Sequence, residues 1–180
     1  MPGRARFDPR RPCRRSVRLS EHDYSAPADY FVTLCANRMK CLFGRIRNDE
    51  MLLNPYGEIA REEWLRIPSV RPEVQLDEFV IMPNHLHGIL IVNAAFKALT
   101  DSAGACHAPL QRHPRTLGAI VGGFKSVCTS RINRYRGHSD EPVWQRGYYE
   151  HIIRNEDDLS EIRDYIITNP FRWDPTGRPA

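Results

Sequence analysis

The chain has 180 residues, of which 41% are hydrophobic, 27% charged and 9% aromatic. This size and composition are typical of one folded domain, and they exclude a wholly disordered chain, because so much apolar surface would not stay solvated. A membrane-spanning chain is also excluded, because the longest apolar run, Ile89 to Val92, is far shorter than the roughly 20 residues that a bilayer requires. No apolar leader follows Met1, so secretion is not expected.

The net charge of +4 is distributed unevenly along the chain. Residues 1–20 carry seven arginines and one acid, whereas residues 49–78 carry eight acids and three arginines. Residues 112–154 carry eight basic and three acidic side chains. A basic arm and a basic segment suit a polyanionic partner, although an idle, solvated surface gives the same pattern. Five cysteines without a C-x-x-C pair indicate a reducing cytoplasm.

Periodicity and turn signals divide the chain into a basic flexible arm (1–28), a folded domain (29–173) and a tail (174–180). The predicted elements begin with a strand at 30–37, a helix from 55 to about 67 capped by Asn54, and strands at 74–82 and 85–92. A loop or insertion at 93–115, a helix from Leu117 through Ile132, an aromatic, extended stretch at 143–154, and a helix from 156 to 169 capped by Asn155 follow. This order predicts an α+β fold with a mostly antiparallel sheet flanked by helices.

Three glycines interrupt the helix that begins at Leu117, namely Gly118, Gly122 and Gly123. Each weakens a helix by roughly 1 kcal/mol relative to alanine. We therefore expect another backbone or a ligand to approach this helix closely.

Two histidines, His85 and His87, are two residues apart on the predicted strand 85–92. Side chains alternate along a strand, so both imidazoles project from one face and can offer two neutral nitrogen ligands to one metal ion. An isolated H-x-H pattern is more often explained by core packing or by capping of the Pro83-Asn84 corner.

The last predicted helix adds Tyr165 and Asn169, which are four residues apart and lie beside its apolar stripe. If the sheet presents His85 and His87 to this flank, two imidazoles, an amide oxygen and a phenol meet. A metal held by His85, His87 and Asn169 would let Tyr165 attack a neutralised phosphate. The alternative is an edge-of-core tyrosine and a helix-end asparagine. The spacings of zinc peptidases, H-E-x-x-H and paired cysteines, are absent.

Four segments, MPNHLHGILIV, FKS…RIN, VWQRGYYEHIIRNEDDL and IRDYIITNP, follow one another in this order between about Tyr30 and Trp173. Together they resemble the REP-associated tyrosine transposases, which belong to the single-tyrosine branch of the HUH (His-hydrophobic-His) nucleases. The resemblance implies a ferredoxin-like HUH architecture, Tyr165 as nucleophile, and His85, His87 and Asn169 as metal ligands.

The same resemblance implies a bacterial, nucleoid-associated enzyme that cleaves single-stranded DNA beside hairpins (REP-like palindromes). A covalent 5′-phosphotyrosine link leaves a free 3′-OH, and strand rejoining is the reverse reaction. Imidazole ligands favour Mn²⁺, while phosphate and water oxygens also suit abundant Mg²⁺. The chain is expected to act as a monomer or a homodimer.

Basic and aromatic side chains near the second and third motifs are candidate DNA contacts: Lys125, Arg131, Arg134, Arg136, Trp144, Arg146, Tyr149 and Arg154. Aromatic stacking on bases is worth roughly 1–3 kcal/mol per base. The alternatives are a core position for Trp144 and ordinary solvated positions for the basic residues. Tyr148 and Tyr149 are rival nucleophiles, but alternation sends them to opposite faces.

Two other functions fit the same residues. One is a domesticated binder of structured DNA that no longer cleaves, and the other is a small zinc hydrolase that uses His85 and His87. Loss of covalent DNA attachment in Tyr165→Phe would distinguish a transposase from the binder. The identity of the metal that restores activity after chelation would distinguish it from the zinc hydrolase.

Overall fold

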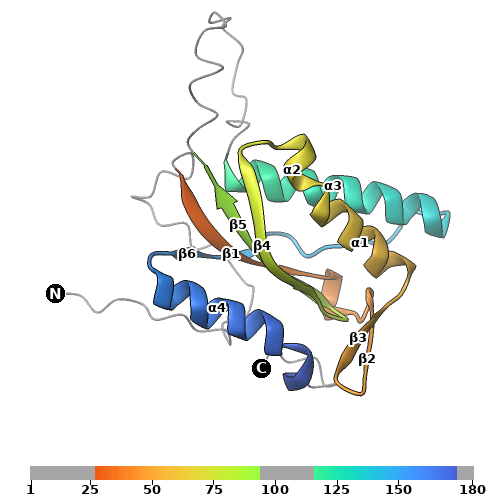
Figure 1. The fold of residues 1–180 in the computed structure, drawn as a ribbon. Helices are drawn as coiled ribbons and strands as arrows, with labels where there is room; N and C mark the ends of the chain where they lie inside the picture. The colour runs from red at the N-terminus through yellow and green to blue at the C-terminus, as the bar shows by residue number, and fades with distance from the viewer. Residues whose placement is uncertain (1–26, 94–115, 174–180) are drawn as a thin grey trace, which may run out of the picture.

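Four antiparallel strands form the main sheet, in the spatial order β4-β5-β1-β6 (Figure 1). They are β1 (Ala28–Cys35), β4 (Val74–Ile81), β5 (His85–Val92) and β6 (Tyr149–Ile153). The computed structural model describes residues 27–93 and 116–173. The predicted arm, the loop at 93–115 and the tail lie outside these residues, except for residues 27, 28 and 93. Ala28 begins β1 rather than ending the arm.

Helices cover both faces of this sheet (Figure 1). One face packs against α1 (Pro55–Leu65), α2 (Ile67–Val70) and α3 (Leu117–Arg136), and the opposite face packs against α4 (Glu156–Thr168). Alternation along β1 separates the two layers, because Tyr30 and Val32 join the first layer while Phe31 joins the second. The order β1-α1-β4-β5-α3-β6 is the ferredoxin-like arrangement. The predicted α+β class with an antiparallel sheet is confirmed.

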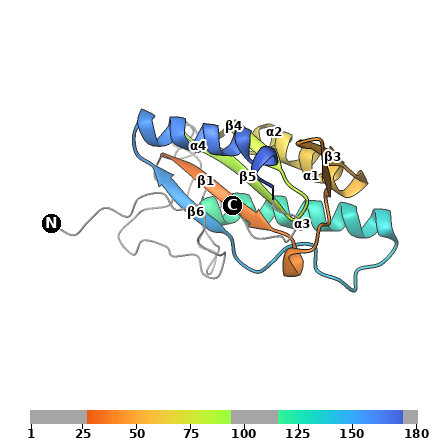
Figure 2. The same ribbon diagram turned by 90° about the horizontal axis from the view of Figure 1, so that it is seen from below.

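Capping residues fix where the helices begin. The Asn54 side chain accepts hydrogen bonds from the backbone N–H groups of Tyr56 and Gly57, and Pro55 occupies the first turn of α1. The Asn155 side chain accepts from the Asp158 N–H at 2.8 Å, so α4 begins at the predicted residue. Figure 2, seen from below, shows α4 running along the strands of the sheet.

A glycine in the central strand β5 allows helix α1 to lie close to the sheet. A Cβ atom added to Gly88 would collide with the indole of Trp64, a side chain of α1 with no exposed surface. The bare backbone at Gly88 therefore lets this indole lie directly on the sheet.

The structure corrects several sequence predictions. A hairpin of β2 (Gly44–Arg47) and β3 (Glu50–Leu53) was not predicted; its signal is the Asn48-Asp49 pair, whose φ angles of 53° and 61° form the primed turn that joins short hairpins. The helix predicted from 55 to about 67 is divided, because α1 ends at Leu65 and α2 begins at Ile67 with Pro68 in its first turn.

Two further corrections concern α3 and the aromatic stretch. A Cβ atom at Gly122 or Gly123 would meet no atom within 4 Å, so no other backbone approaches there. Within the predicted stretch 143–154, only residues 149–153 form a strand of the sheet, while Trp144 makes an isolated bridge with Ala36.

In the described part of the chain, no helix combines the length and apolarity needed to cross a membrane.

Candidate active site

The two histidines lie side by side at the start of β5, on the sheet face that α4 covers. Their ring centroids are 4.4 Å apart, and each residue is only 3% exposed. Strand alternation orients them together, with the buried Leu86 directed to the opposite layer. His85 and His87 therefore lie on the same face of the sheet, as predicted.

The side chains of Tyr165 and Asn169 approach this pair from the C-terminal end of α4. The Tyr165 hydroxyl is 3.3 Å from Nε2 of His87, and the two rings have a centroid separation of 5.1 Å. The Asn169 side chain lies near the His85 ring and raises its pKa. Both residues are buried, at 5% and 6% exposure. The apolar stripe of α4, which packs on Phe31 and Ile89, sets this orientation.

Two neighbouring side chains orient the imidazoles. Nδ1 of His85 is 2.6 Å from Oδ1 of Asn84, and Nδ1 of His87 is 2.8 Å from Oγ1 of Thr33. Because the Asn84 carbonyl oxygen only accepts, we assign the proton of His85 to Nδ1, which leaves a lone pair on Nε2. The same assignment at His87 lets its Nε2 accept the Tyr165 hydroxyl.

Burial keeps both histidines neutral. Desolvation lowers the pKa of His85 to about 4, and the Asn169 side chain partly offsets this effect because its amide oxygen can accept a hydrogen bond from the protonated ring. Desolvation, and then the neighbouring His85, hold the pKa of His87 well below 6.5. Near pH 7 both rings are therefore neutral bases, the form that coordinates metal ions.

The donor set fits a divalent cation. Nε2 of His85 is buried and makes no hydrogen bond of regular geometry with the described residues, as an unused ligand nitrogen would. No group of three or more His, Cys, Asp or Glu side chains suited to a metal occurs within residues 27–93 and 116–173. A cation here would thus combine two imidazole nitrogens with the Asn169 oxygen and with oxygens from water or substrate.

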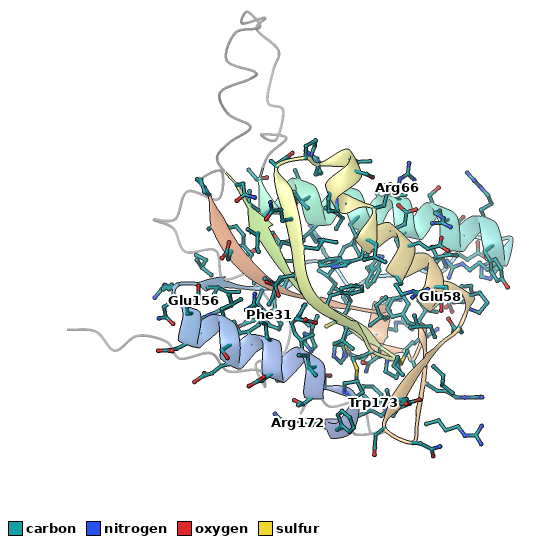
Figure 3. All side chains as sticks on the ribbon, in the orientation of Figure 1. Phe31, Glu58, Arg66, Glu156, Arg172 and Trp173 are labelled. Carbon is teal, nitrogen blue, oxygen red and sulfur yellow. The ribbon has the colours of Figure 1, made fainter. Side chains whose placement is uncertain are left out.

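Three residues of this neighbourhood were missed by sequence reasoning. Thr33 and Asn84 orient the histidines, and the Trp173 ring lies 6.2 Å from the His85 ring. Figure 3 shows Trp173 next to Arg172, beyond the end of α4. Asn84 precedes His85 in the Pro83-Asn84 corner, which was a usable signal. The contact of Thr33 could not be predicted, because it depends on the pairing of Thr33 with His87 across β1 and β5. No local sequence pattern marks Trp173 apart from its position after Pro170.

Four of the predicted DNA contacts interact with other groups of the fold. Arg131 forms ion pairs of 2.6 and 2.7 Å with Glu62 and Glu63, and Lys125 donates to the backbone carbonyls of residues 145 and 147. Arg136 donates to the carbonyls of residues 138 and 141. Trp144 is 7% exposed and packs against aromatic rings of the core. Each of these four groups is thus engaged within the fold, and a role for it in DNA binding stays a prediction.

The remaining predicted contacts are divided between the two sides of the sheet. Arg134 is exposed but belongs to α3, on the side opposite Tyr165. Arg146 and Arg154 are exposed. Tyr149 lies on the α4 side and packs edge-on against Phe31 at 6.3 Å.

The structure also places Tyr148, directly before β6, and His151 within it. Tyr148, as predicted, joins the opposite layer from Tyr149. His151, to which no role was assigned, bonds to Asp158 of α4 at 2.9 Å and so ties this helix to β6.

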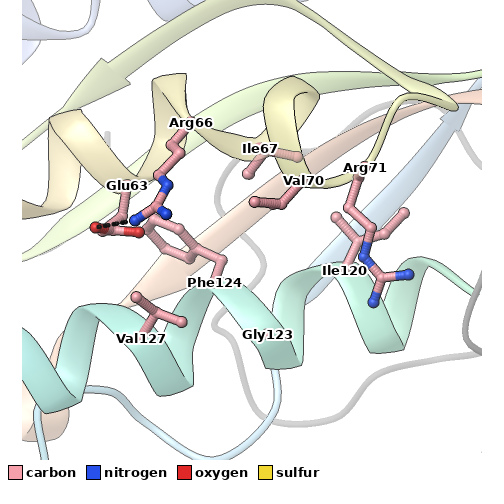
Figure 4. A pocket seen from close by; sticks show the side chains of 9 residues that line it. All are labelled: Glu63, Arg66, Ile67, Val70, Arg71, Ile120, Gly123, Phe124 and Val127. Atoms are coloured by element: carbon pink, nitrogen blue, oxygen red, sulfur yellow. Dashed lines mark ion pairs between the residues drawn. The ribbon is translucent and has the colours of Figure 1, made fainter.

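A cavity of about 240 Å³ lies far from this chemistry, between α1, α2 and α3 (Figure 4). Apolar side chains such as Ile67 and Phe124 line it, with Arg66 and Arg71 at its rim. It occupies the layer on the other side of the sheet from Tyr165 and is separate from the candidate active site.

Comparison with solved structures defines the fold. The chain superposes on a REP-associated tyrosine transposase bound to a REP hairpin, with a TM-score of 0.56 and 20% identity, covering 86% of this chain and 74% of that one. This confirms, at the level of the fold, the resemblance found in the motifs. A putative transposase from Deinococcus radiodurans R1 gives a TM-score of 0.45 and 15% identity, covering 79% of this chain and 90% of that one.

Comparison of sequences defines the family. An uncharacterized protein of Haemophilus influenzae is 42% identical over 170 residues, covering 89% of this chain and 90% of the relative. The chain belongs to the same family as this bacterial protein. No family model matches the chain.

Proposed function

We propose that the protein is a metal-dependent transposase that cleaves and rejoins single-stranded DNA beside hairpins, through a covalent link between Tyr165 and a 5′-phosphate. The carrying observation is the 3.3 Å approach of the Tyr165 hydroxyl to a buried, neutral pair of histidines. The fold shared with a transposase bound to a REP hairpin supports hairpin DNA as the substrate. We place its action on bacterial DNA in the cytoplasm.

In this reaction the phenol oxygen of Tyr165 forms a bond to phosphorus, and the bond from phosphorus to the 3′ oxygen of the preceding nucleotide breaks. The phenol loses its proton and the 3′ oxygen gains one, leaving a free 3′-OH. Rejoining reverses these steps with another 3′-OH. The rigid α4 holds the phenol in place, which lowers the entropic barrier to attack.

His85, His87 and Asn169 would hold a Mg²⁺ or Mn²⁺ ion. When bound, the ion would neutralise the charge of the phosphate and make it accept a weak nucleophile. The phenol of Tyr165 would then give up the hydrogen bond to Nε2 of His87, because one lone pair cannot serve both.

Two exposed arginines, Arg146 and Arg154, are the predicted phosphate contacts that the fold leaves available outside α3. They lie at the two ends of the segment that contains β6. Arg154 precedes Asn155, the cap of α4, whereas both neighbours of Arg146 accept hydrogen bonds from Lys125 of α3. We propose that they bind the DNA backbone, which would make affinity fall with salt. The zinc hydrolase is disfavoured, because the described residues offer no third His, Cys, Asp or Glu ligand at this site.

Incubation of the protein with an end-labelled single-stranded hairpin and Mn²⁺ or Mg²⁺, followed by a denaturing gel, tests this proposal. Wild type should form a covalent adduct. Tyr165→Phe should lose the adduct but keep hairpin binding, whereas the matched control Tyr149→Phe should keep both. An adduct that persists in Tyr165→Phe would refute Tyr165 as nucleophile, and hairpin binding without any adduct in wild type would indicate a binder that does not cleave.

A further inference from the structure

One tryptophan of this chain differs from the other two. Trp64 and Trp144 are buried in the hydrophobic layer between the sheet and α3. Trp173 is partly exposed, belongs to neither hydrophobic layer, and tilts by 34° over the His85 ring at 6.2 Å. A large aromatic side chain left outside the core but beside reactive groups needs another explanation than packing.

The turn that carries Trp173 fixes it relative to the candidate active site. The 3-10 turn η3 (Pro170–Arg172) follows Asn169 directly. The backbone N–H of Arg172 donates to the Asn169 carbonyl at 3.1 Å, and that of Trp173 donates to the Pro170 carbonyl at 3.3 Å. Strand β3 contacts the same turn. The turn that ends at Trp173 is therefore joined through its backbone to the residue that supplies a candidate metal ligand.

A row of four aromatic rings runs from this turn to the nucleophile. The centroid separations are 6.2 Å from Trp173 to His85, 4.4 Å from His85 to His87, and 5.1 Å from His87 to Tyr165. A phosphate positioned for attack by Tyr165 would lie at the histidines. The base of an adjoining nucleotide would then reach the indole, provided that this base is unpaired.

We propose that Trp173 stacks on one unpaired base next to the scissile phosphate and thereby determines where the strand is cut. This inference rests on the proposed function and deepens it by naming a specificity residue. The side chains beside the indole suit a nucleic-acid strand, because Arg172 is exposed and can meet a phosphate while Phe171 is 67% exposed and offers a second aromatic face.

Binding of hairpin oligonucleotides to the full chain with Tyr165→Phe, which removes cleavage, tests the proposal by fluorescence anisotropy. One base at a time near the cleavage site is replaced by an abasic residue. With Trp173 present, one abasic position should weaken binding by about 10-fold, and neighbouring positions should have little effect. Trp173→Ala should remove this position dependence, and Trp173→Phe should keep part of it.

Tyr135→Ala is the matched control, since Tyr135 is an aromatic residue of α3 that is 62% exposed on the opposite side of the sheet. It should retain the full abasic profile. As a second measurement, DNA should protect tryptophan fluorescence of the Tyr165→Phe protein from acrylamide, and Trp173→Phe should abolish that protection because the other two indoles are buried.

An abasic profile that is unchanged in Trp173→Ala would overturn the inference, as would a uniform loss at every position. If Trp173 served only to cover His85, Trp173→Ala would weaken Mn²⁺ binding and leave the profile intact. Failure of this inference is distinguishable from failure of the proposed function, because the adduct at Tyr165 is measured separately in the protein with its native tyrosine. A profile that depends on Trp173 supports stacking even where no adduct forms.

Discussion

The burial of His85 predicts how the stability of the protein depends on pH. Its pKa is about 4 in the folded protein and about 6.5 when the chain is unfolded. Between these values the unfolded state binds one more proton at this site, so stability falls as the pH falls. From pH 7 to pH 5 the free energy of unfolding should decrease by about 2 kcal/mol from this residue alone. His87 acts in the same direction.

Urea unfolding at a series of pH values between 7 and 5, with a chelator present, measures this effect. The carboxylates remain largely ionised in this window, so histidines dominate the slope. His85→Gln should reduce the slope by up to about 1.4 kcal/mol per pH unit, whatever its effect on stability at pH 7. Stability that does not change between pH 7 and pH 5, or an equal slope in the variant, would refute the buried, neutral assignment.

Four other substitutions test separate parts of the structure. Thr33→Val removes the hydroxyl that orients His87 and should weaken Mn²⁺ binding in calorimetry by about 10- to 100-fold, while Thr33→Ser should keep it. Gly88→Ala should cost about 1–3 kcal/mol of unfolding free energy because the methyl group collides with an indole. Gly122→Ala should instead stabilise by about 0.5–1 kcal/mol, since its Cβ meets nothing, and unchanged melting temperatures would contradict both. Arg131→Ala should lower stability by about 1–2 kcal/mol by leaving a buried carboxylate partly unpaired. It should leave hairpin affinity unchanged, and a marked loss of affinity would indicate that Arg131 contacts DNA.

Local patterns were enough to predict the elements that carry the candidate active site. The two-residue spacing of His85 and His87 sets a common strand face, and the four-residue spacing of Tyr165 and Asn169 sets a common helix flank. Both follow from the geometry of single elements. Their meeting could be expected only because α4 has one apolar stripe, which must lie on the sheet.

Features that depend on pairing between distant segments could not be predicted. Thr33 reaches His87 because β1 pairs with β5 in one particular register. Arg131 looked like a free cation on a helix surface, yet α3 packs beside α1, where Glu62 and Glu63 take up its charge. The sequence contains these residues but no local pattern that links them.

The face of the sheet that each helix covers could not be predicted from the sequence either. The basic residues of α3 and the nucleophile on α4 seemed to belong to one DNA surface, but the sheet separates them (Figure 1). A connection such as 137–148 can leave its helix on either side, and only the assembled layers decide between them. This is why Arg134 lies on the opposite side of the sheet from Tyr165.

Mapping of the covalent protein–DNA product by mass spectrometry tests the central claim most directly. Wild type is incubated with a hairpin oligonucleotide and Mn²⁺, digested with a protease and nuclease, and searched for peptides that carry a nucleotide 5′-phosphate. We predict a single modified peptide with the phosphate on Tyr165. Modification of another tyrosine such as Tyr149, or efficient cleavage with no modified tyrosine at all, would contradict the account.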